Sequence, residues 1–515
     1  MSKWDAIVVG AGNGGLLAAV TLAKAGKKTL LLERHNLPGG FATSFKRGRF
    51  EFEASLHELC GFGKSTGMGS IRNMFDKLDL TDKIDWVEIP AAYRLITLSG
   101  DKKIDASMPF GRQAYIDAME KYVPGSRKSV TAFFDLADDI IATTDFFADI
   151  ETFKPSIIKE AVKEHLNFIR TAGYPFNTVL ETLKMPQSAR DILNGYWDYL
   201  SVPTDEVSFI HFASLIREYI TTGAVAPKLR SHEISSAIID EFEKAGGEVW
   251  FNSPVEQILM ENGKVKGIKI AGGKEEYANH VICNTSPHNV FGKLMDPKDV
   301  PEYELKKANS REFSARGFTL FLGLNKSPEE LGITDHCYMI YDTMDTRKQY
   351  DMMKKLETNN AQATVCLNLA DKDASPEGTS ILYLTTLYTA DVWKDVTPEN
   401  YVKTKQYVAN KMIDNFEKAA GVKIRDAIEE IEIATPMTYA RYTDAPQGVI
   451  YGYDACQDDG VVARTIMLEA DEKIPGLRFA GGYGTQHDGY SSSFTSGHNA
   501  ALATLKDMKK EVGAK

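Results

Sequence analysis

The 515-residue sequence predicts an α/β protein: a Rossmann-like, dinucleotide-binding domain interrupted by a second domain with a mixed sheet and a helical lid. Three observations predict this fold. A glycine-rich turn lies between a strand-like apolar run and a helix-like stretch near the N-terminus. An acidic residue ends a second apolar run about twenty residues after that turn. Further nucleotide-binding segments lie in the middle and at the end of the chain, so long insertions must separate them.

The first element is a strand over Asp5–Val9, followed by Gly10-Ala11-Gly12-Asn13-Gly14-Gly15 and a helix over Leu16–Ala25. Gly10 permits the tight turn, Gly12 lets the backbone approach a pyrophosphate, and Gly15 lets the helix pack on the strand. The phosphates then lie at the helix N-terminus, where free N–H groups and the helix dipole favour an anion. The predicted cofactor contacts in this turn are Gly10, Gly12, Asn13, Gly14 and Gly15.

A second strand, Thr29–Leu32, ends in Glu33, where the ribose of a dinucleotide needs an acceptor. A diglycine, Gly39-Gly40, follows within ten residues. A simple nicotinamide-binding domain has no need of it, whereas a flavoprotein does, because this loop must pass close to the pyrophosphate and the flavin edge without a side chain. The pattern favours FAD. The predicted contacts here are Glu33, Arg34, Gly39, Gly40, Phe41, Ala42 and Thr43.

These motifs resemble those of the two-dinucleotide-binding-domain flavoproteins, and within them the phytoene desaturase, carotenoid isomerase and retinol saturase family. Gly39, Gly40 and Thr43 match the family's second glycine motif. Phe41 stands where many relatives have arginine, so a flavin contact made by that arginine would be missing. Phe50–His57 resembles the strand that follows the diglycine loop. The resemblance implies an FAD-binding domain of the glutathione-reductase or amine-oxidase type.

Two further matches lie far from the N-terminus. Residues 476–501 resemble the family's closing flavin motif: a strand ending in Ala-Gly, a glycine-containing loop, and a helix whose N-terminus faces the isoalloxazine. Gly246–Val255 resembles the strand whose last residues usually hold the adenine, and a β-meander and a return strand are expected after it. The cofactor contacts that the resemblance implies in these segments are Val255, Gly481, Gly482, Asp488, Gly489, Tyr490 and Ser491.

The positions of the motifs divide the chain. Residues 1–70, 226–290 and 465–515 are expected to form the discontinuous FAD-binding domain. Residues 71–225 are rich in helical patterns and predict a substrate or lid region, whereas residues 291–464 predict a substrate domain with a mixed β-sheet. The helices expected in these insertions are 129–147, 155–171, 188–200 and 398–419, and the strands are 317–322, 363–369 and 380–387.

Composition narrows the class of protein. The net charge of −11 argues against nucleic acid and against electrostatic capture by an anionic bilayer. The five cysteines are scattered without a Cys-x-x-Cys pair, which favours reduced thiols in a cytoplasmic protein and predicts no metal site. No signal peptide or membrane-spanning run is visible. In carotenoid-type relatives, helices in the position of residues 71–225 form a substrate tunnel or a membrane-dipping face, so the resemblance also implies peripheral membrane contact.

A flavin carries out hydride transfer itself, while the protein supplies orientation and a proton site. Three side chains within or beside the matched segments are candidates for that site: His57, Tyr451 and His487. Tyr451 lies in Pro446–Gly452, which resembles a segment of retinol-saturase-like proteins. Each candidate also has a structural alternative, as a packing or hydrogen-bonding residue.

The predicted function is an FAD-dependent oxidoreductase that acts on carbon–carbon bonds, by desaturation or saturation, of an apolar isoprenoid, polyene or fatty-acid-like substrate. The sequence holds no second glycine-turn unit for NAD(P)H, so electrons are expected to pass to or from an external partner: a quinone, oxygen, or NAD(P)H without its own domain. Three alternatives stay open. They are a flavin-dependent double-bond isomerase, an amine oxidase using Tyr483 and Tyr490 as its aromatic pair, and a non-catalytic FAD-containing carrier or chaperone.

Overall fold

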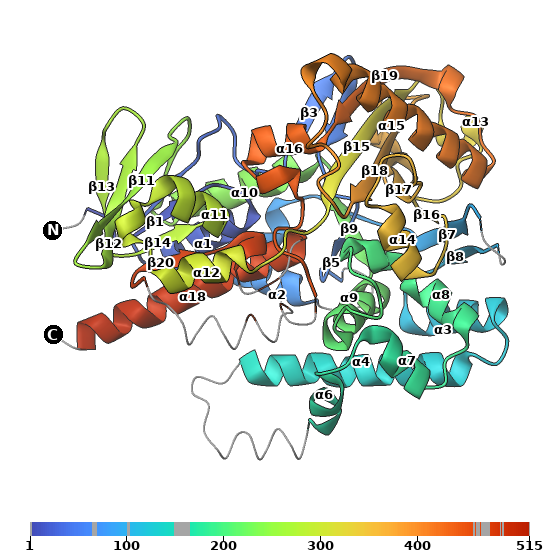
Figure 1. Cartoon of the computed structure of the whole chain (residues 1–515), viewed down its shortest axis with the longest axis horizontal. Coiled ribbons are helices and arrows are strands. Elements are labelled where there is room, and N and C mark those ends of the chain that lie inside the picture. The colour runs from blue at the N-terminus through green and yellow to red at the C-terminus, as the bar shows by residue number, and fades with distance from the viewer. Residues whose placement is uncertain are drawn as a thin grey trace.

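The structure is a computed structural model that describes residues 3–63, 69–99, 103–148, 165–456, 459, 464, 474–484, 486 and 489–513. Two sheets lie at opposite ends of the molecule, each with its own layer of helices, and a group of helices lies beneath the second sheet in the view of Figure 1. The predicted α/β fold class is confirmed.

A five-stranded parallel sheet of order β10-β2-β1-β14-β20 forms the first domain. It gathers strands from three distant parts of the chain. Both of the first two strands are buried along their whole length, so each of the two faces of the sheet needs a covering layer. The strands are β1 (Ala6–Val9), β2 (Thr29–Leu32), β10 (Glu248–Trp250), β14 (Val281–Cys283) and β20 (Leu477–Phe479).

Helices cover one face of this sheet and a small antiparallel sheet covers the other. Ala6 and Val8 share an apolar cluster with α1 (Asn13–Lys24), α10 (Ser231–Lys244) and α18 (Tyr490–Gly513). The alternate side chains of β1 pack instead against the meander. The meander consists of β11 (Val255–Glu261), β12 (Lys264–Ile270) and β13 (Glu275–Tyr277).

The second domain is built on a seven-stranded mixed sheet of order β19-β15-β18-β17-β16-β7-β8, in which only the β16–β7 pair is parallel. One face packs on α15 (Pro398–Ala420), and the other faces the aromatic-rich cluster beside the first domain. The strands are β7 (Tyr93–Thr97), β8 (Asp105–Met108), β15 (Arg316–Leu324), β16 (Cys337–Tyr341), β17 (Gln362–Cys366), β18 (Ser380–Tyr388) and β19 (Ile428–Ala434).

The first insertion supplies most of the helices on the aromatic-rich side of that sheet. The expected helix at 129–147 is α4, the expected helix at 188–200 is α8 followed by a 3-10 helix (Asn194–Tyr199), and the stretch from 155 to 164 lies outside the described residues. The same insertion also contains strands, because β7 and β8 extend the mixed sheet beside β16. The helices are α3 (Arg112–Tyr122), α4 (Arg127–Ala148), α6 (Leu166–Thr171), α7 (Phe176–Thr182), α8 (Gln187–Leu193) and α9 (Phe209–Thr222).

Short elements connect these layers. The two-stranded sheet joins β3 (Ser44–Arg47) to β4 (Phe50–Glu53), and a three-stranded one has the order β5 (Leu59–Cys60), β9 (Ala224–Pro227), β6 (Trp86–Glu88). The remaining α-helices are α2 (Ser70–Lys77), α11 (Pro287–Asn289), α12 (Glu302–Asn309), α13 (Pro328–Leu331), α14 (Thr346–Met352) and α16 (Pro436–Thr443).

Two expected strands end early. The strand expected to run from Phe50 to His57 ends at Glu53, because the next N–H groups turn back to other partners: Ala54 donates to the Thr43 carbonyl and Ser55 to the Glu53 carboxylate. The strand expected over 363–369 ends at Cys366 and continues as a single 3-10 turn (Leu367–Leu369).

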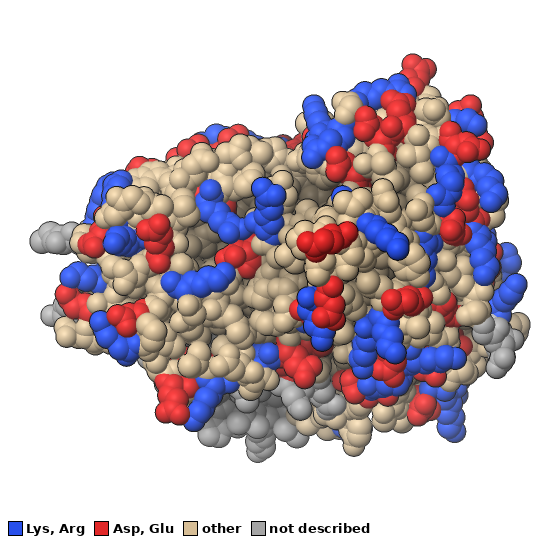
Figure 2. Space-filling view, turned by 45° about the horizontal axis from the view of Figure 1, so that its top comes forward, with Lys and Arg blue, Asp and Glu red and all other residues tan. Residues whose placement is uncertain are grey.

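Charges of both signs are mixed on the face of the molecule seen in Figure 2. Lys and Arg are interspersed with Asp and Glu over the face seen in Figure 2, and uncharged surface lies between the two lobes. Among the described helices, none combines the length and the apolar character needed to cross a membrane.

Candidate active site

The glycine turn lies at the carboxyl edge of the parallel sheet, and neighbouring backbone leaves no room for side chains on it. Gly10 has a φ of +93°, which only glycine adopts readily. A Cβ on Gly12 would lie 2.6 Å from Nδ2 of Asn284, and a Cβ on Gly14 would lie 2.4 Å from the backbone nitrogen of Gly481. The turn is therefore bare backbone at the start of α1.

Asn284 is a residue that the sequence analysis missed. It follows β14 directly, and its N–H donates to the Val9 carbonyl at 2.8 Å. Its side chain lies against the turn and against Gly481, whose added Cβ would be 2.5 Å from Oδ1. The available signal was a polar residue immediately after an apolar strand, because the carboxyl ends of neighbouring parallel strands meet at the ligand-binding edge of such sheets.

Glu33 reaches back to the glycine turn. Its Oε2 accepts the Ala11 N–H at 2.7 Å, and its Oε1 accepts the His35 N–H at 2.8 Å. An ionised carboxylate offers about four lone-pair sites, so acceptor capacity remains for ribose hydroxyls. The loop before β11 lies alongside, since Ser253 donates to the Glu33 carbonyl, and Val255 follows as the first residue of β11.

The diglycine lies directly on the first turn. Gly39 and Gly12 form a parallel bridge, and the Gly39 N–H donates to the Ala11 carbonyl at 2.7 Å. Gly39 has a φ of +117°, and a Cβ there would lie 2.1 Å from the Ala42 carbonyl oxygen. The two glycine segments therefore form one continuous backbone surface.

The neighbours of the diglycine point in different directions. The Phe41 ring lies 5.5 Å from the Tyr439 ring, so an aromatic pair stands where many relatives have arginine. The Phe41 carbonyl accepts hydrogen bonds from Ser55 and Tyr490. Arg34 donates to the Arg441 carbonyl at 3.1 Å and thus contacts α16 rather than the glycine turn.

The closing segment completes this edge. The Tyr490 hydroxyl lies 2.9 Å from the Ser231 hydroxyl, and the Ser491 hydroxyl donates to the Cys60 carbonyl at 3.0 Å. The start of α18 is thereby fixed to the segment that follows β4. Gly489 precedes α18 with a φ of +114°, whereas His487 and Asp488 lie outside the described residues.

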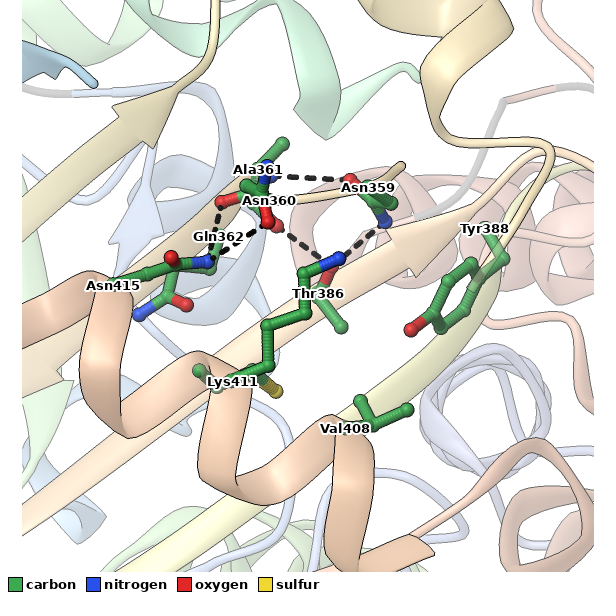
Figure 3. A pocket seen from close by; sticks show the side chains of 10 residues that line it. Asn359, Asn360, Ala361, Gln362, Thr386, Tyr388, Val408, Lys411 and Asn415 are labelled. Atoms are coloured by element: carbon green, nitrogen blue, oxygen red, sulfur yellow. Dashed lines mark hydrogen bonds between the residues drawn. The ribbon is translucent and has the colours of Figure 1, made fainter. Parts of the chain in front are cut away.

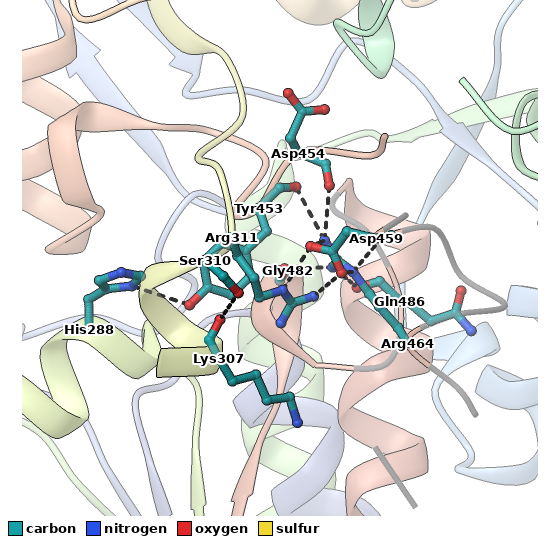
Figure 4. Close-up of polar contacts among 10 residues, drawn as sticks. All are labelled: His288, Lys307, Ser310, Arg311, Tyr453, Asp454, Asp459, Arg464, Gly482 and Gln486. Carbon is teal, nitrogen blue, oxygen red and sulfur yellow. Dashed lines mark hydrogen bonds and ion pairs between the residues drawn. The ribbon is translucent and has the colours of Figure 1, made fainter. Parts of the chain in front are cut away.

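A buried arginine holds the loop at Gly481-Gly482. Arg464 is 2% exposed and donates to the carbonyls of Gly482 and Gln486, each at 3.2 Å (Figure 4). It also pairs with Asp459, which accepts two hydrogen bonds from Arg311. These contacts assign the Arg464 side chain to holding the loop.

His57 is neutral in this structure. Burial lowers the pKa of its imidazole to about 4. Its Nε2 lies 3.2 Å from the Thr385 hydroxyl, which continues through Thr319 to the Tyr439 hydroxyl, at 3.1 and 2.7 Å. The ring can therefore exchange hydrogen bonds along this chain but cannot act as a cation near neutral pH.

Tyr451 and two tyrosines of the first insertion lie in the same region as His57. Tyr451 packs against the aromatic-rich cluster and interacts electrostatically with Tyr219. The His57 ring lies 6.2 Å from the Tyr199 ring, and Tyr199 lies 5.8 Å from Tyr219. The structure thus brings together two of the three proton-site candidates. It also places Glu58, which the sequence analysis did not single out, among these rings.

The polar pocket in Figure 3 lies elsewhere. It is lined by residues of β17, β18 and α15, on the face of the mixed sheet opposite His57. Lys411 donates to the carbonyls of Leu356 and Glu357, and Asn359 donates to Thr386 and Leu387. Lys411 and Asn359 are thus held by neighbouring protein groups, which is typical of a structural role, while the buried Oε1 of Gln362 has no partner.

Comparison with known proteins agrees with this geometry. Residues 8–78 match a family model described as an NAD(P)-binding Rossmann-like domain. The chain is 28% identical over 482 residues to all-trans-retinol 13,14-reductase of Danio rerio, covering 87% of this chain and 77% of that one. It is 23% identical over 466 residues to a chloroplastic prolycopene isomerase 2 of an Oncidium hybrid cultivar, covering 87% and 75%.

Solved structures show the same fold. An oxidoreductase from Methanosarcina mazei superposes with a TM-score of 0.63 at 16% identity, covering 98% of this chain and 99% of that one. A double mutant of putrescine oxidase gives a TM-score of 0.63 at 14% identity, with coverage of 98% and 99%. The bare glycine edge and the facing mixed sheet therefore define an amine-oxidase-like flavoprotein fold. Within that fold class, the chain is similar over most of its length to retinol reductases and prolycopene isomerases, which confirms the predicted resemblance to the carotenoid isomerase and retinol saturase family.

Proposed function

We propose that this protein binds FAD and acts on carbon–carbon double bonds of an apolar polyene of the retinoid or carotenoid kind. Related proteins support the class of reaction, since they are named as a retinol reductase and a prolycopene isomerase. A reductase consumes electrons and an isomerase does not. Saturation, desaturation and isomerisation are therefore the three reactions that experiment must distinguish.

One observation carries the proposal: three separate segments meet as bare backbone at the N-terminus of α1. They are the first glycine turn, Gly39-Gly40 and Gly481-Gly482, with Glu33 at one end. Within the described residues, no side chain caps α1 and its first turn holds no acidic residue, so its free N–H groups suit a pyrophosphate. The buried Oδ1 of Asn13 also has no partner. These features fit FAD, which supplies hydride transfer when bound.

The surroundings favour an apolar substrate. The side of the mixed sheet that faces the first domain carries an aromatic-rich cluster, and the half-buried rings of Phe41, Tyr199 and Tyr451 border it. Rings and aliphatic groups of this kind suit a polyene better than a charged molecule. We place the substrate cavity between the flavin and the helices of residues 71–225.

Two alternative functions on the same fold can be compared with this proposal. A double-bond isomerase needs no net supply of electrons, and the lack of a second glycine-turn unit within this sequence favours it over an NAD(P)H-fed reductase. An amine oxidase is less well supported, because the Tyr483 ring is edge-on to Tyr453 and the Tyr490 ring edge-on to Phe494.

The test first identifies the cofactor and then measures which compounds react with the flavoprotein. Mass spectrometry of the cofactor released from purified protein should show FAD, and FMN or no flavin would contradict the proposal. The flavoprotein should then be mixed anaerobically, in oxidised and reduced forms, with polyenes, fatty acids and amines. A polyene-dependent spectral change or isomer formation supports the proposal. Reduction by amines alone would identify an amine oxidase, and no response at all would identify a carrier.

A further inference from the structure

We propose that Glu58 and Tyr199 form the proton-transfer pair of the site, with Glu58 held as a neutral carboxylic acid behind the half-buried phenol of Tyr199. The inference rests on the proposed function and names the group that exchanges a proton with the substrate. His57, the candidate suggested by the sequence, lies beside this pair.

Glu58 is buried without the partners that an ionised carboxylate needs. It is 4% exposed, its Oε1 accepts a hydrogen bond from the Tyr199 hydroxyl at 3.3 Å, and its buried Oε2 has no partner. A buried polar group left unpaired is costly, and a buried charge more so, unless the group stays neutral. The site therefore favours the protonated acid.

Glu53, five residues earlier, shows what a satisfied buried carboxylate looks like. It is also 4% exposed, but it accepts the Ser231 N–H at the start of α10 at 2.7 Å, and the N–H groups of Ser55 and Leu56 lie at 3.4 Å. A helix N-terminus and several donors stabilise a negative charge. Burial still raises the pKa of Glu53, although these donors oppose it, whereas Glu58 has a single hydroxyl partner. The two glutamates thus have equal burial and different partners, and what distinguishes Glu58 is its unpaired oxygen beside Tyr199.

Tyrosine rings enclose the Glu58 carboxyl group on the substrate side. Tyr196 and Tyr199 stack at 5.0 Å, and Tyr219 lies 4.9 Å from Tyr196. The Tyr219 hydroxyl also donates to the Glu58 carbonyl at 3.4 Å. Tyr199 is half buried, unlike the fully buried Tyr196, so its hydroxyl links the carboxyl group to the border of the aromatic-rich cluster.

The same segment contacts the closing helix. Two residues after Glu58, Cys60 accepts a hydrogen bond from Ser491 in the first turn of α18. Leu59 belongs to the core of the first domain, whereas Cys60 packs against the aromatic-rich cluster. Because side chains alternate along an extended chain, Glu58 lies on the same side as Cys60, towards the substrate domain.

Most of the titratable groups around Glu58 stay neutral over a wide pH range. Burial raises the pKa of the Cys60 thiol to about 12 and lowers that of His57 to about 4. Burial also raises the pKa of the Cys337 thiol and of the hydroxyls of Tyr196, Tyr199 and Tyr219. Burial raises the pKa of Glu58 itself to about 8, opposed by the neighbouring hydroxyls of Tyr196 and Tyr199. Burial also raises the pKa of Asp198, which precedes Tyr199 in the chain, to about 6, so Glu58 and Asp198 are the groups of this cluster that titrate near neutral pH.

The step balances in the saturating direction. The π bond of the alkene breaks, one carbon forms a C–H bond with hydride supplied by the reduced flavin, and the other forms a C–H bond with the Tyr199 hydroxyl proton. The Glu58 proton passes to the Tyr199 oxygen, which leaves a neutral phenol and a carboxylate that solvent reprotonates. A bound reduced flavin would supply the hydride, after receiving its electrons from an external two-electron donor. In an isomerisation the same proton is added and then removed.

The first test is spectroscopic and needs no substrate. Infrared difference spectra between the wild type and Glu58→Gln at pH 7 should show the loss of one protonated-carboxyl band, and this difference should disappear as the pH rises through about 8. The contributions of Glu53 and Asp454, whose pKa values burial also raises, are common to both proteins and cancel. Glu51→Gln is the matched control, because Glu51 lies on β4 and bonds to Ser44. An unchanged protonated-carboxyl absorption in Glu58→Gln would overturn the proposal.

The second test is kinetic. Glu58→Gln and Tyr199→Phe should keep FAD affinity and the flavin spectrum, while the substrate-dependent rate falls at least about a hundredfold. Glu58→Asp should restore part of the rate with a shifted pH profile, which a purely structural role would not produce. If both variants kept the wild-type rate, the proton-transfer role of Glu58 and Tyr199 would be overturned while the proposed function stood. If the wild type turned over no polyene, the proposed function would fail, and this role would fail with it.

Discussion

At the scale of single residues, hydrogen-bond partners decide what a buried or half-buried acid does. Glu33 joins the glycine turn to the end of β2 through two backbone N–H groups. Glu53 joins β4 to α10, and Glu58 has no donor for its second oxygen. The sequence showed three similar glutamates, and only the fold distinguishes them.

Glu33→Ala should weaken FAD binding about ten- to a hundredfold, because a hydrogen bond to a charged group is worth roughly 1.5–3 kcal/mol. Titration of apoprotein with FAD measures it. Glu256→Ala is the control, since Glu256 is exposed on β11. Equal affinity of the Glu33→Ala variant and the wild type would show that Glu33 only shapes the turn.

His336 should make the protein sensitive to acid. It is 1% exposed, neither ring nitrogen has a partner, and burial lowers its pKa to about 3. The unfolded chain binds a proton near pH 6.5, so this group lowers stability as the pH falls from 6.5 towards 3.

For a pKa near 3 in the folded protein, His336 lowers the free energy of unfolding at pH 5 by about 2 kcal/mol. The free energy of unfolding measured with urea should therefore be lower at pH 5 than at pH 7, and His336→Leu should reduce this difference by about 2 kcal/mol. His35→Leu, at an exposed site, is the control. If the pH 7 to pH 5 difference in the free energy of unfolding were the same in His336→Leu as in the wild type, the folded protein would tolerate the charged His336 ring.

At the scale of elements, close approach between helices holds the cofactor edge together. A Cβ on Gly497 would lie 1.9 Å from the Gly14 carbonyl oxygen, so α18 rests directly on the first turn of α1. The packing of α18 on α1 and the position of Gly481 beside the turn thus depend on one another.

Gly497→Ala should force α18 away from α1 and lower the free energy of unfolding by about 1–3 kcal/mol, the usual cost of overpacking. Thermal or urea unfolding measures it, and FAD affinity should fall in parallel. Gly513→Ala lies near the end of the same helix with no atom within 4 Å of the added Cβ, and it should change neither quantity. Normal stability of Gly497→Ala would contradict the packing.

Elements with strong local patterns were predictable. The strand at Thr29–Leu32 and the long helix after Pro398 lie where their sequences indicate, because their patterns and flanking signals are local. β7 was not predicted, because its pairing with β16 joins residues far apart in the chain. Asn284, Glu58 and Tyr199 were missed for the same reason, since their burial and partners exist only once distant elements have packed.

At the scale of the whole molecule, the parallel sheet and the mixed sheet have separate tasks. The first presents bare backbone at its carboxyl edge, and the second faces that edge with aromatic side chains. We expect the flavin to lie between the polar backbone of the glycine segments and the aromatic side chains of the mixed sheet. The account therefore requires both a dinucleotide and a long apolar ligand at the junction of the two domains.

Single-turnover product analysis tests that central claim most directly. Anaerobically reduced protein would be mixed with one equivalent of a retinoid or carotenoid, with the flavin spectrum and the product mass followed together. The account predicts either flavin oxidation with a product two hydrogens heavier, or an isomer of equal mass formed with the flavin still reduced. The oxidised protein is mixed with the same polyenes in parallel, where a desaturase would give a product two hydrogens lighter. Polyenes recovered unchanged from both the reduced and the oxidised protein would contradict the account.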